Sequence, residues 1–249
     1  MVPKIIHYCW FGPKPFPPLA ERCLKSWQRY MPAYELKLWT EKTFDISCTP
    51  FVQEAYHHGK YAFVSDYARL WALHEYGGVY LDTDVELIRS VDDLCVQGGW
   101  MGREKPGREQ PNRYPVALGL GFALPKGHPW LRLLLDKYEQ MKFPDPNDKG
   151  SVITIVRVVT DLLEEKGLKM DDIYQLLEDV HIYPTEYFCP KSYYTGLSRI
   201  TDRTYSIHHY DASWMSSGQK FKDRLTHLLG PIGKGLIDIK KRLVGKKFR

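Results

Sequence analysis

The sequence predicts an α/β fold with a mostly parallel central sheet flanked by helices. Short apolar runs of strand length alternate with longer segments that have helical periodicity. Gly- and Pro-containing breaks separate these segments. The 249 residues, 43% of them hydrophobic and 14% aromatic, are enough to build a sizeable core. Alternation of strands and helices is the pattern of layered α/β domains.

The first third of the chain contains the clearest strand–helix alternation. Between residues 34 and 39, Tyr34, Leu36 and Leu38 alternate with charged or aromatic neighbours, as in a half-buried strand. In order, the expected elements are a strand over 4–10, a Gly/Pro-rich loop over 11–18, a helix over 19–30, a strand over 34–39, helices over 50–58 and 65–76, and a strand running into residues 82–84.

The second part of the chain has weaker signals and longer breaks. Residues 98–115 are rich in Gly, Pro, Arg, Glu and Asn, which favours a long loop beside the site. The expected elements after it are a strand over 116–124, a helix over 128–142, a turn over 143–150, a helix over 152–166, and short strands over 180–184 and 203–209.

The helix expected over 65–76 carries its own start and stop signals. Ser65 is a suitable N-cap, and Asp66 in the first turn would complement the helix dipole. Gly77 is a suitable C-cap. Asp66 and Arg69 are three residues apart and therefore share one helix face. On the helix alone, a surface ion pair of little energetic value is the alternative to a functional pair.

Two carboxylates, Asp82 and Asp84, follow a short apolar strand that begins after Gly77 and Gly78. Side chains alternate along a strand, so the two aspartates are expected on the same side. Adjacent carboxylates repel unless a cation lies between them or one is protonated. Oxygen ligands of this kind suit Mg²⁺ or Mn²⁺, with Asp84 as the direct ligand and Asp82 as its partner in metal or ribose binding.

The order Ser-Asp-x-x-Arg, then Gly-Gly-x-Tyr-x-Asp-x-Asp, resembles a family of sugar transferases. The family includes yeast Golgi mannosyltransferases, bacterial capsule glycosyltransferases and, more distantly, the glucosylating clostridial toxins. The resemblance runs from about Val2 to Trp214. Its further landmarks are residues 3–12, 127–129, 183–190 and 207–214.

The resemblance implies a GT-A type nucleotide-sugar-binding fold and a retaining, metal-dependent transfer from a nucleotide-diphosphate donor, such as a UDP- or GDP-sugar, to a saccharide acceptor. Asp66 and Arg69 match the family's contacts to donor sugar hydroxyls, and Ser213 and Trp214 match its diphosphate contacts. A metal ligand five residues before the tryptophan corresponds to His209.

The residue pattern adds three expectations to the site. His208 and His209 are neighbours in a strand, so only one of them can point at the metal, and the resemblance implies that it is His209. Trp10 lies at the end of the first strand, where open α/β sheets bind ligands, and could stack on the nucleobase. Tyr80 precedes the carboxylates on the same face and is expected near the donor or the metal ligands.

The basic charge is concentrated in a terminal segment. The chain carries +5, whereas residues 219–249 alone hold ten Lys/Arg and two Asp, which leaves −3 for the remainder. We therefore expect a catalytic domain over 1–218 and a basic amphipathic tail over 219–249 that binds an anionic membrane surface. A disordered tail or a packed terminal helix are the alternatives. The branch resemblance and the tail together suggest a lipid-linked acceptor in capsule, exopolysaccharide or lipopolysaccharide synthesis.

The remaining features restrict the location and the class of protein. Five cysteines without a Cys-x-x-Cys pair fit free thiols in a reducing cytosol. The sequence shows neither a signal peptide nor an apolar run of about 18 residues, so we expect a cytoplasmic protein on the inner face of the membrane. An aspartyl-nucleophile phosphatase is disfavoured by Glu86, four residues after Asp82, and a non-catalytic membrane or nucleic-acid-binding module by the negative body.

Overall fold

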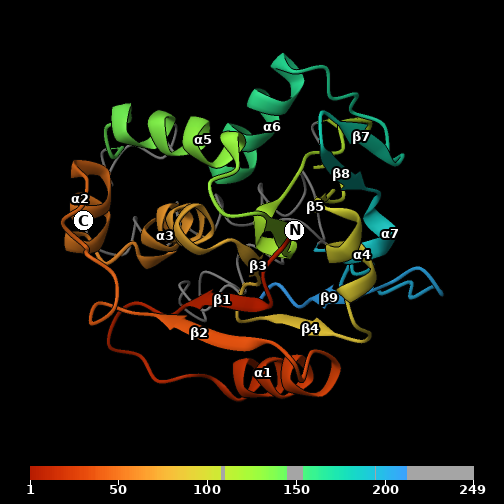
Figure 1. Ribbon diagram of the computed structural model, residues 1–249, viewed down its shortest axis with the longest axis horizontal. Coiled ribbons are helices and arrows are strands. Elements are labelled where there is room, and N and C mark those ends of the chain that lie inside the picture. The colour runs from red at the N-terminus through yellow and green to blue at the C-terminus, as the bar shows by residue number, and fades with distance from the viewer. Residues whose placement is uncertain (108–109, 145–153, 194, 212–249) are drawn as a thin grey trace, which may run out of the picture. The chain divides into compact units, whose positions relative to one another are not determined.

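The computed structural model describes residues 1–107, 110–144, 154–193 and 195–211 (Figure 1). These residues divide into two compact units, of which one comprises residues 1–191 and 199–209. Residues 192–198, apart from 194, and residues 210–211 belong to the second unit. The basic tail over 219–249, Ser213 and Trp214 lie outside the described residues, as does the domain boundary at 218.

The larger unit is built around a seven-stranded sheet in the order β2-β1-β3-β6-β5-β8-β7. Strands β2, β1, β3, β5 and β8 run in one direction, and β6 and β7 run against them. The seven strands are β1 (Ile5–Cys9), β2 (Glu35–Trp39), β3 (Gly78–Tyr80), β5 (Gly99–Gly102), β6 (Phe122–Leu124), β7 (Gln175–Leu177) and β8 (Val180–Tyr183). The expected α/β fold with a mostly parallel central sheet is thus confirmed, with an antiparallel strand, β6, inserted between β3 and β5.

A second, two-stranded sheet lies beside the first. It pairs β4 (Val85–Leu87) with β9 (Ser206–His208) in antiparallel register, with Val85 opposite His208. We call this pair the β4–β9 ribbon. It joins chain segments more than 100 residues apart, and Figure 1 shows it next to α1.

Helices pack against both sheets. Helix α3 packs against α2 and α5 and contacts β1 and β3, while α1 packs on β4 (Figure 1). The helices are α1 (Pro18–Tyr30), α2 (Pro50–His57), α3 (Tyr61–Tyr76), α4 (Asp92–Gln97), α5 (Pro129–Gln140), α6 (Ile155–Glu165) and α7 (Thr185–Phe188), with a 3₁₀ turn η1 (Leu118–Leu120).

Helix α3 starts earlier than its sequence signals predict. It begins at Tyr61, so Ser65 is not its N-cap; the Ser65 hydroxyl donates to the carbonyl of Tyr61, one turn earlier. Asp66 consequently lies in the second turn and is buried rather than positioned for the helix dipole. The C-terminus is as predicted, because Gly77 adopts φ +65° and its N–H bonds to Leu73.

The largest error of the sequence prediction is the long loop over 98–115. Its first residues form β5, which is buried along its whole length in the interior of the sheet, between β6 and β8. The two glycines that suggested a loop are there for packing: a Cβ on Gly99 would lie 2.7 Å from Leu124, and one on Gly102 would lie 2.7 Å from Phe188. The strand predicted over 116–124 is confirmed only at β6, since Leu118–Leu120 form η1.

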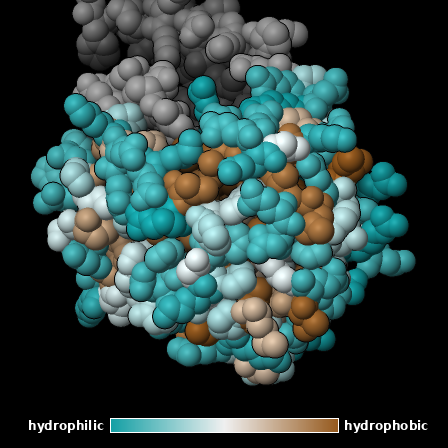
Figure 2. All heavy atoms as spheres, turned by 45° about the horizontal axis from the view of Figure 1, so that its top comes forward, coloured by the Kyte–Doolittle hydropathy of each residue, from teal (hydrophilic) through white to brown (hydrophobic). Residues whose placement is uncertain are grey.

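The surface offers no membrane-crossing element within the described ranges: none of their helices has both the length and the apolar character to span a bilayer. Figure 2 shows mostly hydrophilic side chains on the face that it presents, with hydrophobic ones in small groups. The α/β unit therefore keeps its apolar residues largely for its own core.

Candidate active site

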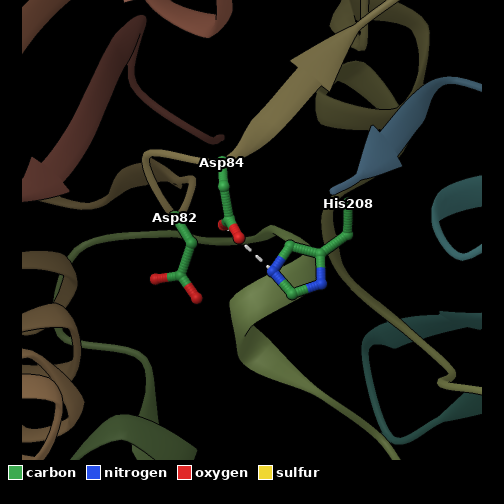
Figure 3. Close-up of side chains that lie close together, drawn as sticks. All are labelled: Asp82, Asp84 and His208. Carbon is green, nitrogen blue, oxygen red and sulfur yellow. Dashed lines mark ion pairs between the residues drawn. The ribbon is translucent and has the colours of Figure 1, made fainter. Parts of the chain in front are cut away.

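Three potential metal ligands converge where β3 ends and the β4–β9 ribbon begins. One ligand atom from each of Asp82, Asp84 and His208 lies within 4.8 Å of the others. The Nε2 atom of His208 is 3.1 Å from Oδ1 of Asp84, and Figure 3 shows the two side chains directed at each other with Asp82 beside them. His208 follows the two aspartates by about 125 positions in the sequence, and the pairing of β4 with β9 brings it next to them.

The aspartates reach this position through a turn rather than along a strand. Strand β3 stops at Tyr80, and the N–H of Val85 bonds to the carbonyl of Asp82 at 2.9 Å. The prediction that the two aspartates lie in a strand, whose alternation would put both carboxylates on one side, is therefore wrong. The turn nevertheless brings the two carboxylates close together, as expected.

The histidine that lies with the two carboxylates is His208, and not His209, at which the metal ligand was expected. The two neighbours do point in opposite directions, as strand geometry requires. His208 faces Asp84, whereas Nε2 of His209 lies 2.7 Å from Oε2 of Glu86 and 3.2 Å from Arg22. The family resemblance pointed to the segment over 207–214 as the source of a ligand. The register of the β4–β9 ribbon decides which of its two histidines faces the carboxylates.

Arg69 is the centre of a buried ion network next to the aspartates. Its Nη2 lies 3.0 Å from Oδ1 of Asp66 and 3.3 Å from Oδ1 of Asp82, and its Nε donates to the carbonyl of Ser65. The Arg69 side chain is only 5% exposed. The surface ion pair considered as the alternative is thus excluded, because a buried pair is strongly coupled to its surroundings.

Tyr80 holds the same oxygen of Asp82. Its hydroxyl donates to Oδ1 at 2.8 Å, and the Arg69 guanidinium lies over its ring, 4.6 Å from the centroid. Tyr80 is almost completely buried. It therefore lies next to the two aspartates and limits the orientation of the Asp82 carboxylate.

The electrostatics of the site favour a bound cation. Burial raises the pKa of Asp66 to about 6 although Arg69 opposes it, and burial together with Asp84 raises the pKa of Asp82. Burial lowers the pKa of His208, but the carboxylates of Asp84, Asp82 and Glu104 together outweigh it and the net shift is upward. Burial and the closeness of the carboxylates both oppose negative charge here, and a cation between Asp82 and Asp84 would relieve their repulsion.

Sequence reasoning missed Glu104 as a member of this neighbourhood. It follows β5 at the edge of the sheet where β1 and β3 also end, and its charge contributes to the raised pKa of His208. Glu104 was assigned to the long loop, so no sequence signal related it to the aspartates. A strand assignment for residues 99–102 would have placed it at this edge.

Trp10 lies at the end of β1, as expected, but its surroundings are now visible. Its indole N–H donates to the carbonyl of Lys14, and its ring stacks on Phe16 at 4.7 Å. The described structure therefore places one face of the ring against Phe16. Stacking of Trp10 on a nucleobase stays a prediction.

The donor set is chemically suited to a divalent cation. Two carboxylates and one imidazole, gathered within a single small site, match the ligands that Mn²⁺ and related ions accept. The backbone leaves space for the carboxylate, since a Cβ on Gly119 would lie 2.5 Å from Oδ2 of Asp82. Asp82, Asp84 and His208 are the residues that would hold the ion.

Comparison with known proteins places the two aspartates of this site, Asp82 and Asp84, in a recognised sequence region. Residues 17–98 match the family described as a glycosyltransferase sugar-binding region containing a DXD motif. The chain is also 34% identical over 134 residues to inositol phosphoceramide mannosyltransferase 3 of Schizosaccharomyces pombe. That match covers 52% of this chain and 35% of the yeast protein, so the chain spans about a third of this relative.

Similar solved structures also carry glycosyltransferase names. The PaToxG glycosyltransferase overlaps 67% of this chain and 70% of its own, with 17% identity and a TM-score of 0.47. A glycosyltransferase involved in glycosylation of the major capsid of PBCV-1 overlaps 89% of this chain and 100% of its own, with 9% identity and a TM-score of 0.46.

Proposed function

We propose that the chain is a glycosyltransferase of the kind whose sugar-binding region contains a DXD motif, and that it transfers a hexose from a nucleotide-diphosphate donor to a saccharide acceptor. The observation that carries the proposal is the convergence of Asp82, Asp84 and His208 beside the buried Asp66–Arg69 pair. We propose a GT-A type arrangement in which this edge of the sheet binds the donor.

Different residues of the site are proposed to bind different parts of the donor. Asp82, Asp84 and His208 would hold Mn²⁺ or Mg²⁺, which supplies Lewis-acid stabilisation of the charge that develops on the leaving diphosphate. The Asp66 carboxylate would accept hydrogen bonds from hydroxyls of the donor sugar. The Arg69 guanidinium would donate hydrogen bonds to hydroxyls of the same sugar. Because Ser65, Asp66 and Asp82 already fix the Arg69 guanidinium, it needs little reorganisation on binding.

Contacts to the nucleotide are proposed for three further residues. Trp10 stacks on the base from the end of β1. Ser213 and Trp214, which lie outside the described residues, bind the diphosphate, the indole N–H donating to a phosphate oxygen. These assignments rest on the family resemblance of the segments around residues 3–12 and 207–214.

We propose retention of the anomeric configuration by a front-side displacement. The bond from the anomeric carbon to the diphosphate breaks, and the acceptor oxygen bonds to the same face. The acceptor proton passes to the departing phosphate oxygen. The pairing of both Asp66 and Asp82 with Arg69 supports this path, because a carboxylate held in an ion pair is a poor covalent nucleophile.

The acceptor is proposed to be a growing capsule, exopolysaccharide or lipopolysaccharide unit on a lipid carrier. The yeast relative is named as a mannosyltransferase of inositol phosphoceramide, which supports a mannose donor and a lipid-borne acceptor by analogy. The ten basic residues of the segment over 219–249 support attachment to the inner face of an anionic membrane.

The test compares Asp84→Asn with Glu86→Gln, a matched change of the carboxylate two residues further along. Donor turnover is measured with UDP- and GDP-sugars, with Mn²⁺, with Mg²⁺ and with excess EDTA. We expect turnover in wild type and Glu86→Gln, its loss in EDTA, and its loss in Asp84→Asn while the thermal unfolding midpoint stays close to that of wild type.

Two results would contradict the proposal. Full turnover in excess EDTA excludes a metal-dependent transferase. A wild-type rate for Asp84→Asn excludes Asp84 from the active site. A thermal-shift screen of UDP- and GDP-sugars with Mn²⁺ identifies the donor, because a ligand at about 100 times its dissociation constant stabilises the folded protein by roughly 2.7 kcal/mol.

A further inference from the structure

Gly119, in η1, lies against the metal-binding aspartate. A Cβ built on it would lie 2.5 Å from Oδ2 of Asp82 and 3.6 Å from Nη1 of Arg69. Carbon atoms do not approach a carboxylate oxygen this closely without something moving. Position 119 therefore has no room for a side chain while Asp82 keeps its observed orientation.

The backbone of Gly119 gives no other reason for a glycine. Its φ lies outside the left-handed region, so other residues could adopt its conformation. Gly121, two residues later, differs because its φ of +114° requires glycine. At position 119, the neighbouring carboxylate alone excludes a side chain.

Neither partner of this contact can withdraw easily. Oδ1 of Asp82 is bound by the Tyr80 hydroxyl and by Arg69, which limits rotation of the carboxylate and directs Oδ2 toward Gly119. On the other side, Leu118 and Leu120 are buried, and the N–H of Ala117 bonds to the carbonyl of Gly102 in β5. A methyl group at 119 would consequently turn the Asp82 carboxylate or displace η1.

We propose that Gly119 is a positioning residue for Asp82: its missing side chain leaves the space in which Oδ2 is presented to the cation while Oδ1 stays bound to Tyr80 and Arg69. This inference rests on the function proposed above and assigns the two oxygens of Asp82 to different tasks. Position 119 thereby sets the affinity for the metal and, through it, for the donor diphosphate.

The first experiment measures Mn²⁺ affinity by calorimetry for wild type, Gly119→Ala and Gly99→Ala. Gly99 is the matched control, because its φ is also outside the left-handed region and its Cβ would lie 2.7 Å from Leu124 in the core. We expect Gly119→Ala to weaken Mn²⁺ binding by about tenfold or more, the range seen when residues that orient a ligand are changed. Gly99→Ala should lower stability but change Mn²⁺ affinity by less than about twofold.

The second experiment is a double-mutant cycle on the unfolding equilibrium in metal-free buffer, using Gly119→Ala and Asp82→Ala. If the methyl group acts by striking the carboxylate, the loss of stability caused by Gly119→Ala should largely disappear once Asp82 is truncated. Should Gly119→Ala alone fail to fold, the double variant is expected to fold. Additive effects, or a double variant that also fails to fold, overturn the proposal.

The two readouts separate this inference from the function on which it rests. If wild type binds no Mn²⁺, the metal-dependent function is contradicted, and the cycle still decides whether Gly119 positions Asp82. Unchanged Mn²⁺ affinity in Gly119→Ala, with normal binding by wild type, overturns the positioning role while leaving the proposed function intact.

Discussion

The two faces of the β4–β9 ribbon carry similar charged groups in different settings. On one face His208 pairs with Asp84 at 3.1 Å, and on the other His209 pairs with Glu86 at 2.7 Å. The pKa of His208 is raised, however, whereas that of His209 is lowered by burial and by the nearby Lys191, despite its bond to Glu86. Adjacent residues in similar ion pairs thus respond in opposite directions.

The difference comes from the charges that surround each pair. The inner cluster sets the carboxylates of Asp66, Asp82 and Asp84 against Arg69, so negative charge is in excess. The outer cluster places Arg22 beside Glu86 and His209. An ion pair whose charge is already balanced needs no ligand, whereas the inner cluster can be completed by a divalent cation.

The largest effect should separate the two histidines. His208→Ala removes a proposed metal ligand and should reduce donor turnover by about a thousandfold, equivalent to about 4 kcal/mol of transition-state stabilisation. His209→Ala is the matched control and should stay within about tenfold of wild type, a change of about 1.4 kcal/mol. The comparison would be broken if steady-state rates showed His209→Ala to be the more damaging change.

The next largest effect is expected for Arg69, the buried arginine of the inner cluster. Arg69→Ala leaves Asp66 and Asp82 buried without their counter-ion and should lower the free energy of unfolding by about 3 kcal/mol or more. Urea unfolding at neutral pH measures it. Because unpaired buried carboxylates take up protons, part of the loss should be recovered near pH 5. A loss below about 1 kcal/mol would mean that the network is no better buried than a surface pair.

His7 extends the comparison to a buried histidine in a neutral setting. Its Nε2 bonds to the carbonyl of Gly77, and its Nδ1 accepts from the Trp39 indole, which only the neutral ring can do. Burial lowers its pKa from 6.5 to about 4. The unfolded chain therefore binds the proton first, and stability is lost as pH falls from about 6.5 toward 4.

This lowered pKa predicts that wild type loses about 2 kcal/mol more stability between pH 7 and pH 5 than His7→Gln does. Urea unfolding at several pH values gives both slopes. His57→Gln, which removes an exposed imidazole on α2, should keep the wild-type slope. Equal slopes for wild type and His7→Gln would show that His7 is not held neutral.

The smallest effect is expected for Arg22, whose side chain is 56% exposed. Arg22→Ala should change the free energy of unfolding by no more than about 1 kcal/mol, as for surface ion pairs in general. Donor turnover should also be close to that of wild type. A loss as large as that of Arg69→Ala would show that the outer cluster holds His208 in place through the ribbon.

Several features of the fold and site could be predicted because they depend on neighbours in the chain. Asp66 and Arg69 share a helix face through the spacing of three residues, and Gly77 ends α3 through its own conformational freedom. Asp82 and Asp84 stay together because a single short turn holds both. Strand β5 could not be predicted, since its glycines are explained only by Leu124 and Phe188, which pack on it.

The sequence by itself determined that this chain is an α/β protein with two neighbouring aspartates shortly after a helix that ends at Gly77, since periodicity and helix C-caps act over a few residues. Only the tertiary structure decided that His208 rather than His209 joins the aspartates, that Arg69 is buried, and that Gly119 borders Asp82. Each of these depends on strand register or packing between distant segments, and a shift of one residue in a register turns every side chain to the other face.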